Sequence, residues 1–225
     1  MADGNHNAVM QAIQDYRVIQ NQIGITDKKV CRTLELFSHV CKNLKWCKEQ
    51  DGEDCRFDTK AYKTLQEVGQ LVVTKEQKIL GDVPGIHIGQ LFNYKTELAA
   101  CGLHGYYVGG IDYLALKVAG GEKVVLVAVS IVTNFDNDDD DEMEDAAAVP
   151  APTPGTLKYK LPQKLKKGIL ALSNNKEYGV HVRVIRDVRR DRDDGLGYSY
   201  AGLFLVQSFN KNAIGEYEFE LRRTN

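Results

Sequence analysis

Basic side chains concentrate in one stretch of this 225-residue chain, and phosphate binding is the chemistry that they favour. Residues 157–192 carry 11 lysines or arginines against three acids, a net charge of +8. Such side chains bind phosphates, and arginine also reads base edges through paired hydrogen bonds. Aspartates interleave with the arginines of residues 186–195, so a solvated run of mixed charge is the alternative interpretation. The candidates for contacts with phosphates or base edges are Arg186, Arg189, Arg190, Arg192, Lys164, Lys166 and Lys167.

An acidic segment precedes this basic stretch. Eight of the ten residues 136–145 are Asp or Glu, and a run rich in alanine and proline follows up to Gly155. Without those eight acids, 29 basic residues would face 23 acidic ones, and the formal net charge would change from −2 to +6. A segment of this composition buries too little apolar surface to order itself. We therefore expect residues 136–156 to form a disordered surface insertion.

Sequence motifs for catalysis, cofactor binding or metal binding are absent. There is no G-x-G-x-x-G, P-loop or H-E-x-x-H pattern, and His104 has no partner motif for nucleophilic chemistry. The five cysteines lack zinc-ligand spacing, so reduced thiols are expected. No apolar run is long enough to span a membrane, and the first 20 residues lack a signal-type apolar core, which predicts an intracellular protein. The sequence favours a binding module without cofactor or metal over an enzyme.

Helices are predicted in the first third of the chain, where they would support the later segments. Apolar residues recur every three or four positions over residues 8–23 and again over residues 30–47. Thr26 or Asp27 has the side chain of an N-cap for the second of these helices. A further helix, from about residue 58 to residue 68, would pack on the second one as a hairpin.

Strands are predicted in the remaining two thirds. Apolar and polar residues alternate over residues 86–94, and a continuous apolar run covers residues 124–132. The last third, residues 168–225, is typical of strands separated by turns. Helices followed by strands predict an α+β protein.

Short motifs spread over about 140 residues resemble, in their order, those of the SRA-YDG domain family. The likeness is greatest to the SRA-YDG domains of plant Su(var)-type histone lysine methyltransferase homologues, and it extends back to about Lys28. The motifs are V-P-G-I-x-I-G-x-x-F at Val83, G-L-H at Gly102, G-I-D-Y at Gly110, A-V-S-I-V at Ala128, L-A-L-S-N at Leu170, V-R-V-I-R at Val182 and Y-x-Y-A-G-L-F-L-V at Tyr198.

This resemblance implies a twisted, barrel-like sheet of the PUA-like kind behind an N-terminal helical hairpin. It divides the chain into an N-terminal helical extension (1–26), the hairpin with a connecting strand (27–80) and the SRA-YDG domain (81–225). It also implies a nuclear chromatin protein that binds double-stranded, methylated DNA and flips the modified cytosine out of the stack. The catalytic SET segment of those homologues does not follow, so histones or a histone methyltransferase would be partners.

By the same resemblance, the family's base pocket maps onto residues after the apolar strand. Phe135 takes the place of the first stacking aromatic, Asp138 or Asp136 that of the acid facing the base, and Tyr159 that of the second aromatic. Residues 133–134 (Thr-Asn) replace the family's glycines, and the glycine segment after the second aromatic is missing. An altered pocket is therefore an alternative.

The resemblance also implies that two loops correspond to the family's DNA-contacting loops, so we expect them to contact DNA. In residues 105–110 (G-Y-Y-V-G-G), Val108 would fill the space that the base vacates in the minor groove, with Tyr106 and Tyr107 beside it. An exposed turn with an aromatic pair is the alternative. The second loop is residues 186–195. The name-giving Y-D-G element is Tyr-Ala-Gly at residues 200–202, without its acid.

The sequence supports two functions as hypotheses. The first is a non-enzymatic reader of 5-methylcytosine that acts by base flipping in chromatin silencing. The second is an SRA-like interaction or scaffold module with a degraded base pocket, which docks basic partners such as histones through its acidic segment.

Overall fold

The computed structural model describes residues 2–51, 56–74, 76–105, 109–118, 123–133, 155–188, 197–213 and 215–224. Within the first range, side chains are described for residues 6–46. In these parts of the chain, no helix is both long and apolar enough to cross a lipid bilayer.

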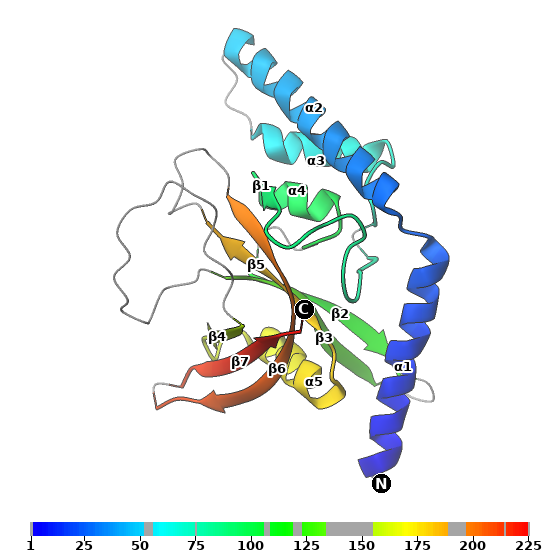
Figure 1. Ribbon diagram of the computed structural model, residues 1–225, viewed down its shortest axis with the longest axis vertical. Coiled ribbons are helices and arrows are strands. Elements are labelled where there is room, and N and C mark those ends of the chain that lie inside the picture. The colour runs from blue at the N-terminus through cyan, green and yellow to red at the C-terminus, as the bar shows by residue number, and fades with distance from the viewer. Residues whose placement is uncertain are drawn as a thin grey trace.

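A seven-stranded sheet forms the centre of the molecule (Figure 1). The strands run in the order β2-β3-β5-β6-β7-β4, and β1 pairs with β6 outside this path. Strands β3 and β5 are parallel, and the other pairs are antiparallel. Together with the N-terminal helices, this sheet confirms the predicted α+β class. The strands are β1 (Leu91–Phe92), β2 (Ile111–Lys117), β3 (Val124–Thr133), β4 (Thr156–Leu161), β5 (Val182–Asp187), β6 (Tyr198–Lys211) and β7 (Tyr217–Arg223).

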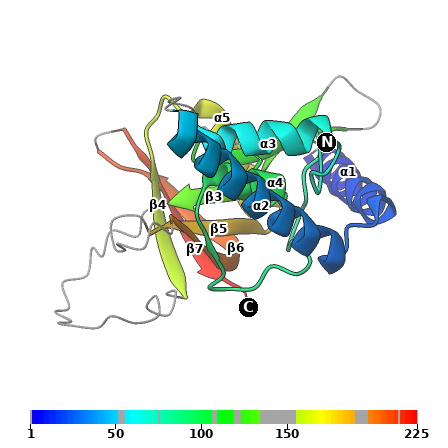
Figure 2. The same cartoon turned by 90° about the horizontal axis from the view of Figure 1, so that it is seen from above.

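The described part of the chain forms five helices, which surround the sheet (Figures 1 and 2). Helices α2, α3 and α4 gather on one side, where Phe37, Leu65 and Ala100 share an apolar cluster. Helix α5 packs on the other side through Ala171 and Leu172, and α1 lies along β2. The helices are α1 (Ala2–Ile23), α2 (Asp27–Asp51), α3 (Phe57–Glu67), α4 (Lys95–Ala100) and α5 (Lys166–Tyr178).

The predicted helical hairpin is confirmed. The periodic apolar positions Val30, Phe37 and Cys41 of α2 are buried, and α3 turns back against the same face. Of the two candidate caps, Thr26 is the one that acts, because its hydroxyl accepts a hydrogen bond from the Lys29 amide at 3.3 Å.

Two strand predictions were wrong. Residues 166–178 form the helix α5 instead. The sequence pattern did not indicate this helix, because its buried face includes the small Gly168 and Ala171 and the polar Asn175 and is not a continuous apolar stripe. Residues 86–94 yield only the two-residue β1. Gly85 and Gly89 adopt positive φ angles of 76° and 85°, which glycine alone adopts readily, and the chain turns there.

Asn175 fixes α5 to the sheet. Its side-chain oxygen accepts the Ala128 amide at 2.7 Å, and its amide nitrogen donates to the Ala128 carbonyl at 2.8 Å and the Val180 carbonyl at 3.0 Å. A fully buried amide with this many partners sets the position of the helix along β3.

Arg183, in the middle of β5, is 1% exposed and binds three backbone carbonyls in two separate segments. Its Nε donates to the Leu103 carbonyl at 3.0 Å, and its Nη1 donates to the Ile79 carbonyl at 2.6 Å and the Gly81 carbonyl at 2.5 Å. The guanidinium therefore holds residues 79–81 and the segment after α4 against the sheet.

We expect Arg183→Met to destabilise the protein by about 3 kcal/mol or more, because three buried carbonyls lose their donor. The free energy of unfolding, measured by urea denaturation, checks this. Arg222→Met, at an exposed position of β7, is the matched control and should stay within about 0.5 kcal/mol of the wild type. Equal effects of the two variants would contradict the role given to Arg183.

Candidate nucleic-acid interface

Three chain segments reach the same end of the sheet. Ile111, the first residue of β2, pairs with Ile131 near the end of β3, and the Gly110 carbonyl accepts the Val132 amide, so residues 109–110 lie beside that end. Because β3 and β5 are parallel, Thr133 pairs with Arg186, and the chain leaves both strands on this side. Asp187 then pairs with Tyr198, where β6 begins. The stems of all three loops predicted to contact DNA are therefore neighbours.

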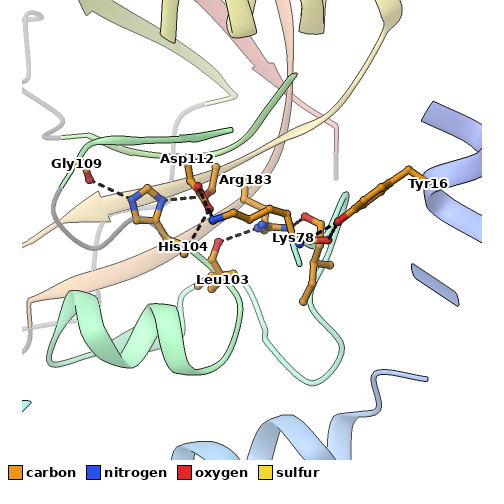
Figure 3. Close-up of polar contacts among 10 residues, drawn as sticks. Tyr16, Lys78, Leu103, His104, Gly109, Asp112 and Arg183 are labelled. Carbon is orange, nitrogen blue, oxygen red and sulfur yellow. Dashed lines mark hydrogen bonds and ion pairs between the residues drawn. The ribbon is translucent and has the colours of Figure 1, made fainter. Parts of the chain in front are cut away.

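His104 closes the first of these loops (Figure 3). Its Nε2 lies 3.1 Å from the Gly109 carbonyl, and its Nδ1 lies 2.8 Å from Ser130 Oγ on β3. A carbonyl only accepts hydrogen bonds, so Nε2 carries the hydrogen and Nδ1 accepts one from the serine hydroxyl. The fully buried imidazole thus ties both ends of the loop to each other and to the sheet.

Asp112 holds the start of the same loop. Its carboxylate accepts the Gly105 amide at 2.9 Å and binds Lys78 Nζ at 2.9 and 3.1 Å (Figure 3). The Asp112 and Lys78 side chains are only 5% and 15% exposed, so this is a buried ion pair with little screening by water. A Cβ on Gly105 would lie 2.5 Å from Lys78 Nζ, so a larger residue there would displace the lysine.

The end of the loop is held from two further sides. The Val132 amide donates to the Gly110 carbonyl at 2.7 Å, and Lys95 Nζ donates to the Gly109 carbonyl at 3.4 Å. Residues 104–105 and 109–112 are therefore fixed by β3, by α4 and by the Lys78–Asp112 pair.

Many of the predicted contact residues lie outside the described part of the chain, so their roles stay predictions. In each case the structure describes the residues at which their loop begins and ends. The residues concerned are Tyr106, Tyr107, Val108, Phe135, Asp138, Arg189, Arg190 and Arg192.

Tyr159, the predicted second stacking ring, is described. It lies in the middle of β4, only 8% exposed, among the apolar side chains of the main core, and burial raises the pKa of its hydroxyl well above the usual value. Its hydroxyl oxygen lies 3.6 Å from the place that a Cβ on Gly110 would take. Tyr159 is therefore next to the end of the first loop, with its ring largely covered by protein.

The predicted basic residues Lys164, Lys166 and Lys167 are exposed at the start of α5. This helix end lies against the start of β2, where the first loop ends, because a Cβ on Gly168 would come within 2.6 Å of Ile111 Cδ1. Arg186 is half-buried at the end of β5, beside Thr133. The structure thus brings four of the seven predicted basic residues to the sheet end where the three loops meet.

The sequence prediction missed the polar network beneath the first loop. The sequence motifs gave His104 no partner and gave Lys78 and Asp112 no role. A usable signal was present for Asp112, which is a charged residue inside the otherwise uncharged motif G-I-D-Y. Charged residues in such positions are usually paired.

Metal binding gains no support from the described residues, which contain no group of three or more His, Cys, Asp or Glu placed to hold an ion. Cys41 and Cys101 are buried free thiols, and burial raises the pKa of each to about 12. They are therefore poor nucleophiles and poor metal ligands at neutral pH.

Acidification should destabilise the protein through His104. Burial lowers the pKa of His104 to about 4, against 6.5 for the free side chain, although nearby Asp112 acts in the opposite direction. Between these values the unfolded chain binds a proton that the folded protein does not. Stability is thus retained above about pH 6.5 and lost as the pH falls towards 4, by at most about 1.4 kcal/mol per pH unit.

His104→Gln should remove this slope, because glutamine keeps a donor and an acceptor without titrating. Urea denaturation at several pH values between 4 and 7 measures it. His181, whose pKa is also lowered by burial, contributes equally to both proteins and cancels in the comparison. Parallel pH profiles for the variant and the wild type would contradict the assignment.

Comparison with known proteins identifies relatives of this architecture. The SAD/SRA domain model matches residues 79–225. A YDG domain-containing protein of Arabidopsis thaliana is 34% identical over 210 residues, which cover 87% of this chain and 62% of the relative. The Arabidopsis histone-lysine N-methyltransferase SUVH6, specific for H3 lysine 9, is 31% identical over 87% of this chain and 27% of its own length. The chain thus spans less than two thirds of either relative.

Two solved structures share the fold. The structure of Arabidopsis SUVH6 in complex with SAM aligns with a TM-score of 0.64 and 30% identity, covering 88% of this chain and 39% of that one. KRYPTONITE in complex with mCHG DNA and SAH aligns with a TM-score of 0.64 and 25% identity, covering 88% and 44%. With its sheet, its loop stems and these matches, the chain belongs to the SAD/SRA (YDG) domain family.

Proposed function

We propose that this chain binds methylated DNA as a non-enzymatic reader that extrudes the modified cytosine. The observation that carries the proposal is the meeting of three loop stems at one end of the sheet, beside exposed lysines. Base flipping needs a pocket, a residue that fills the vacated space and a grip on the backbone. In this proposal, the segment after Thr133 supplies the pocket through Phe135 and Asp138. Val108 fills the space in the stack.

The charge pattern supports phosphate contact at this end. Lys164, Lys166 and Lys167 stand at the start of α5, where the helix dipole is already positive. Lysines at that position cost the helix some stability, so their clustering is explained by an anionic partner. Arg186, Arg189, Arg190 and Arg192 would add contacts from the second loop.

The relatives supply the ligand class. KRYPTONITE, 25% identical to this chain, was solved with mCHG DNA, and other relatives are H3 lysine-9 methyltransferases. By analogy, we place this chain in the nucleus, in chromatin silencing, with histones or a histone methyltransferase as partners. No residue of the described interface forms a catalytic constellation, so the proposed role is binding.

Phe135→Ala should reduce the preference for methylated DNA by about tenfold, because stacking on an aromatic ring contributes about 1–3 kcal/mol per base. Fluorescence anisotropy with methylated, hemimethylated and unmethylated duplexes of one sequence measures the preference. Phe209→Ala, at a partly exposed phenylalanine near the other end of β6, is the matched control and should leave it unchanged. Equal weak binding of all three duplexes to the wild type would overturn the proposal.

The acidic segment offers a second candidate function, a scaffold that docks basic partners. Replacing its eight carboxylates in residues 136–145 by amides keeps the length of the connection and separates the two functions. A DNA reader freed of these charges should bind duplexes more tightly, most of all at low salt, because repulsion from the phosphates is removed. A scaffold should instead lose binding of a histone-tail peptide, with DNA affinity unchanged. Titrations at 50 and 200 mM salt distinguish the outcomes.

A further inference from the structure

Helix α1 grips the segment that leads into the sheet. Tyr16 and Gln20, one turn apart on one face of α1, make four hydrogen bonds to the backbone of Lys78 and Leu80. Tyr16 Oη donates to the Lys78 carbonyl at 2.7 Å and accepts the Lys78 amide at 2.9 Å. Gln20 accepts the Leu80 amide at 2.7 Å and donates to the Leu80 carbonyl at 3.2 Å. The two side chains thus replace a neighbouring β-strand.

The opposite edge of this segment is held by Arg183, which binds the Ile79 and Gly81 carbonyls. The backbone polar groups of Lys78 and Leu80 therefore face α1, and the carbonyls of Ile79 and Gly81 face β5. The backbone of Lys78 itself is held on the α1 side by Tyr16. Burial raises the pKa of Tyr16, so its hydroxyl keeps the hydrogen that it donates at neutral pH.

A continuous polar chain links α1 to the first DNA-facing loop (Figure 3). It runs from Tyr16 to the Lys78 backbone, from Lys78 Nζ to Asp112, and from Asp112 to the Gly105 amide. Lys78 Nζ can hold Asp112 at 2.9 Å only while the lysine backbone stays in place. The position of Gly105 is thus coupled to a helix that lies more than 80 residues earlier in the chain.

Helix α1 itself is held against the sheet by apolar contacts. Val9 and Ile13 of α1 are buried against Leu114 and Leu116 of β2 and Val127 of β3. Asp112 of β2 and Ser130 of β3 bind the stem of the first loop, so α1 and the loop stem are both held by the same two strands. The position of α1 relative to the stem of the first loop is therefore fixed.

We propose that α1 contributes to the DNA interface, with Tyr16 as a residue that positions Gly105, at the stem of the first loop, through Lys78 and Asp112. This inference rests on the proposed function, because the loop is assigned to DNA there. Tyr16 does not reach the DNA in this scheme. It acts by fixing the loop stem, so its loss should reduce discrimination between duplexes more than it reduces general affinity for phosphates.

The first test needs no DNA. In Tyr16→Phe, hydrogen exchange of the Gly105 amide, followed by NMR, should accelerate about threefold to tenfold, the effect of losing one or two ordinary hydrogen bonds. Amides paired between β5 and β6 should keep their rates, which separates local loosening from global destabilisation. Tyr178→Phe removes the hydroxyl of another tyrosine that packs near α1 and is the matched control. An unchanged Gly105 rate in Tyr16→Phe would overturn the proposal.

The second test measures the ratio of affinities for methylated and unmethylated duplexes. Tyr16→Phe should lower this ratio about threefold to tenfold. Asp112→Asn should do the same, and the double variant should lose no more than the worse single one, because both act through one chain of contacts. Multiplied effects in the double variant would show independent action and contradict the coupling.

The two tests separate the two proposals. If the wild type binds all duplexes alike, the proposed function fails, and with it the DNA role of α1. The Gly105 exchange rate still decides whether Tyr16 controls the loop stem. If the wild type discriminates and Tyr16→Phe discriminates equally well, the reader stands and the role of α1 is rejected.

Discussion

A buried guanidinium holds this structure together. Arg183 has almost no contact with water, so burial lowers its pKa, and nearby Asp112 and Asp82 act in the opposite direction and help to keep it charged. Its three carbonyl partners come from segments about 80 and 100 residues away. One of them, Leu103, directly precedes His104, and another, Ile79, directly follows Lys78. The two residues that fix the first loop are thus each one peptide unit from a contact with Arg183.

The regular elements could largely be predicted from the sequence where burial follows a simple period. The stripe of α2 and the apolar run of β3 are of this kind, since each faces a continuous apolar neighbour. Helices α4 and α5 could not be predicted in this way. The buried side of α5 contains Gly168 and Asn175, and α4 is only six residues long. Neither leaves a strong pattern.

The interface was predictable in outline only. The motifs place the loops in sequence order, and the parallel pairing of β3 with β5 brings their stems together. The network beneath the first loop joins residues 26, 34 and 62 positions apart, such as His104 with Ser130 and Tyr16 with Lys78. A single sequence can show that a charged residue needs a partner, but it does not show which residue that partner is at such separations. The replacement of the Y-D-G acid by Ala201 is consistent with its place in the apolar core, where it is 1% exposed.

The strand order also sets a minimum length for the connection between Thr133 and Thr156. Strands β5, β6 and β7 lie between β3 and β4, so the chain must cross four inter-strand steps, roughly 19 Å along the sheet. The pairings place Thr156 in the row of Leu205 and Thr133 in the row of Ser199, which adds roughly 20 Å along the strands. An extended chain covers at most about 3.5 Å per residue, so about eight residues are enough for the crossing. The connection has 22, from Asn134 to Gly155. Most of the connection is therefore longer than the strand order requires. Insertions and changes of composition within it would leave the strand order intact.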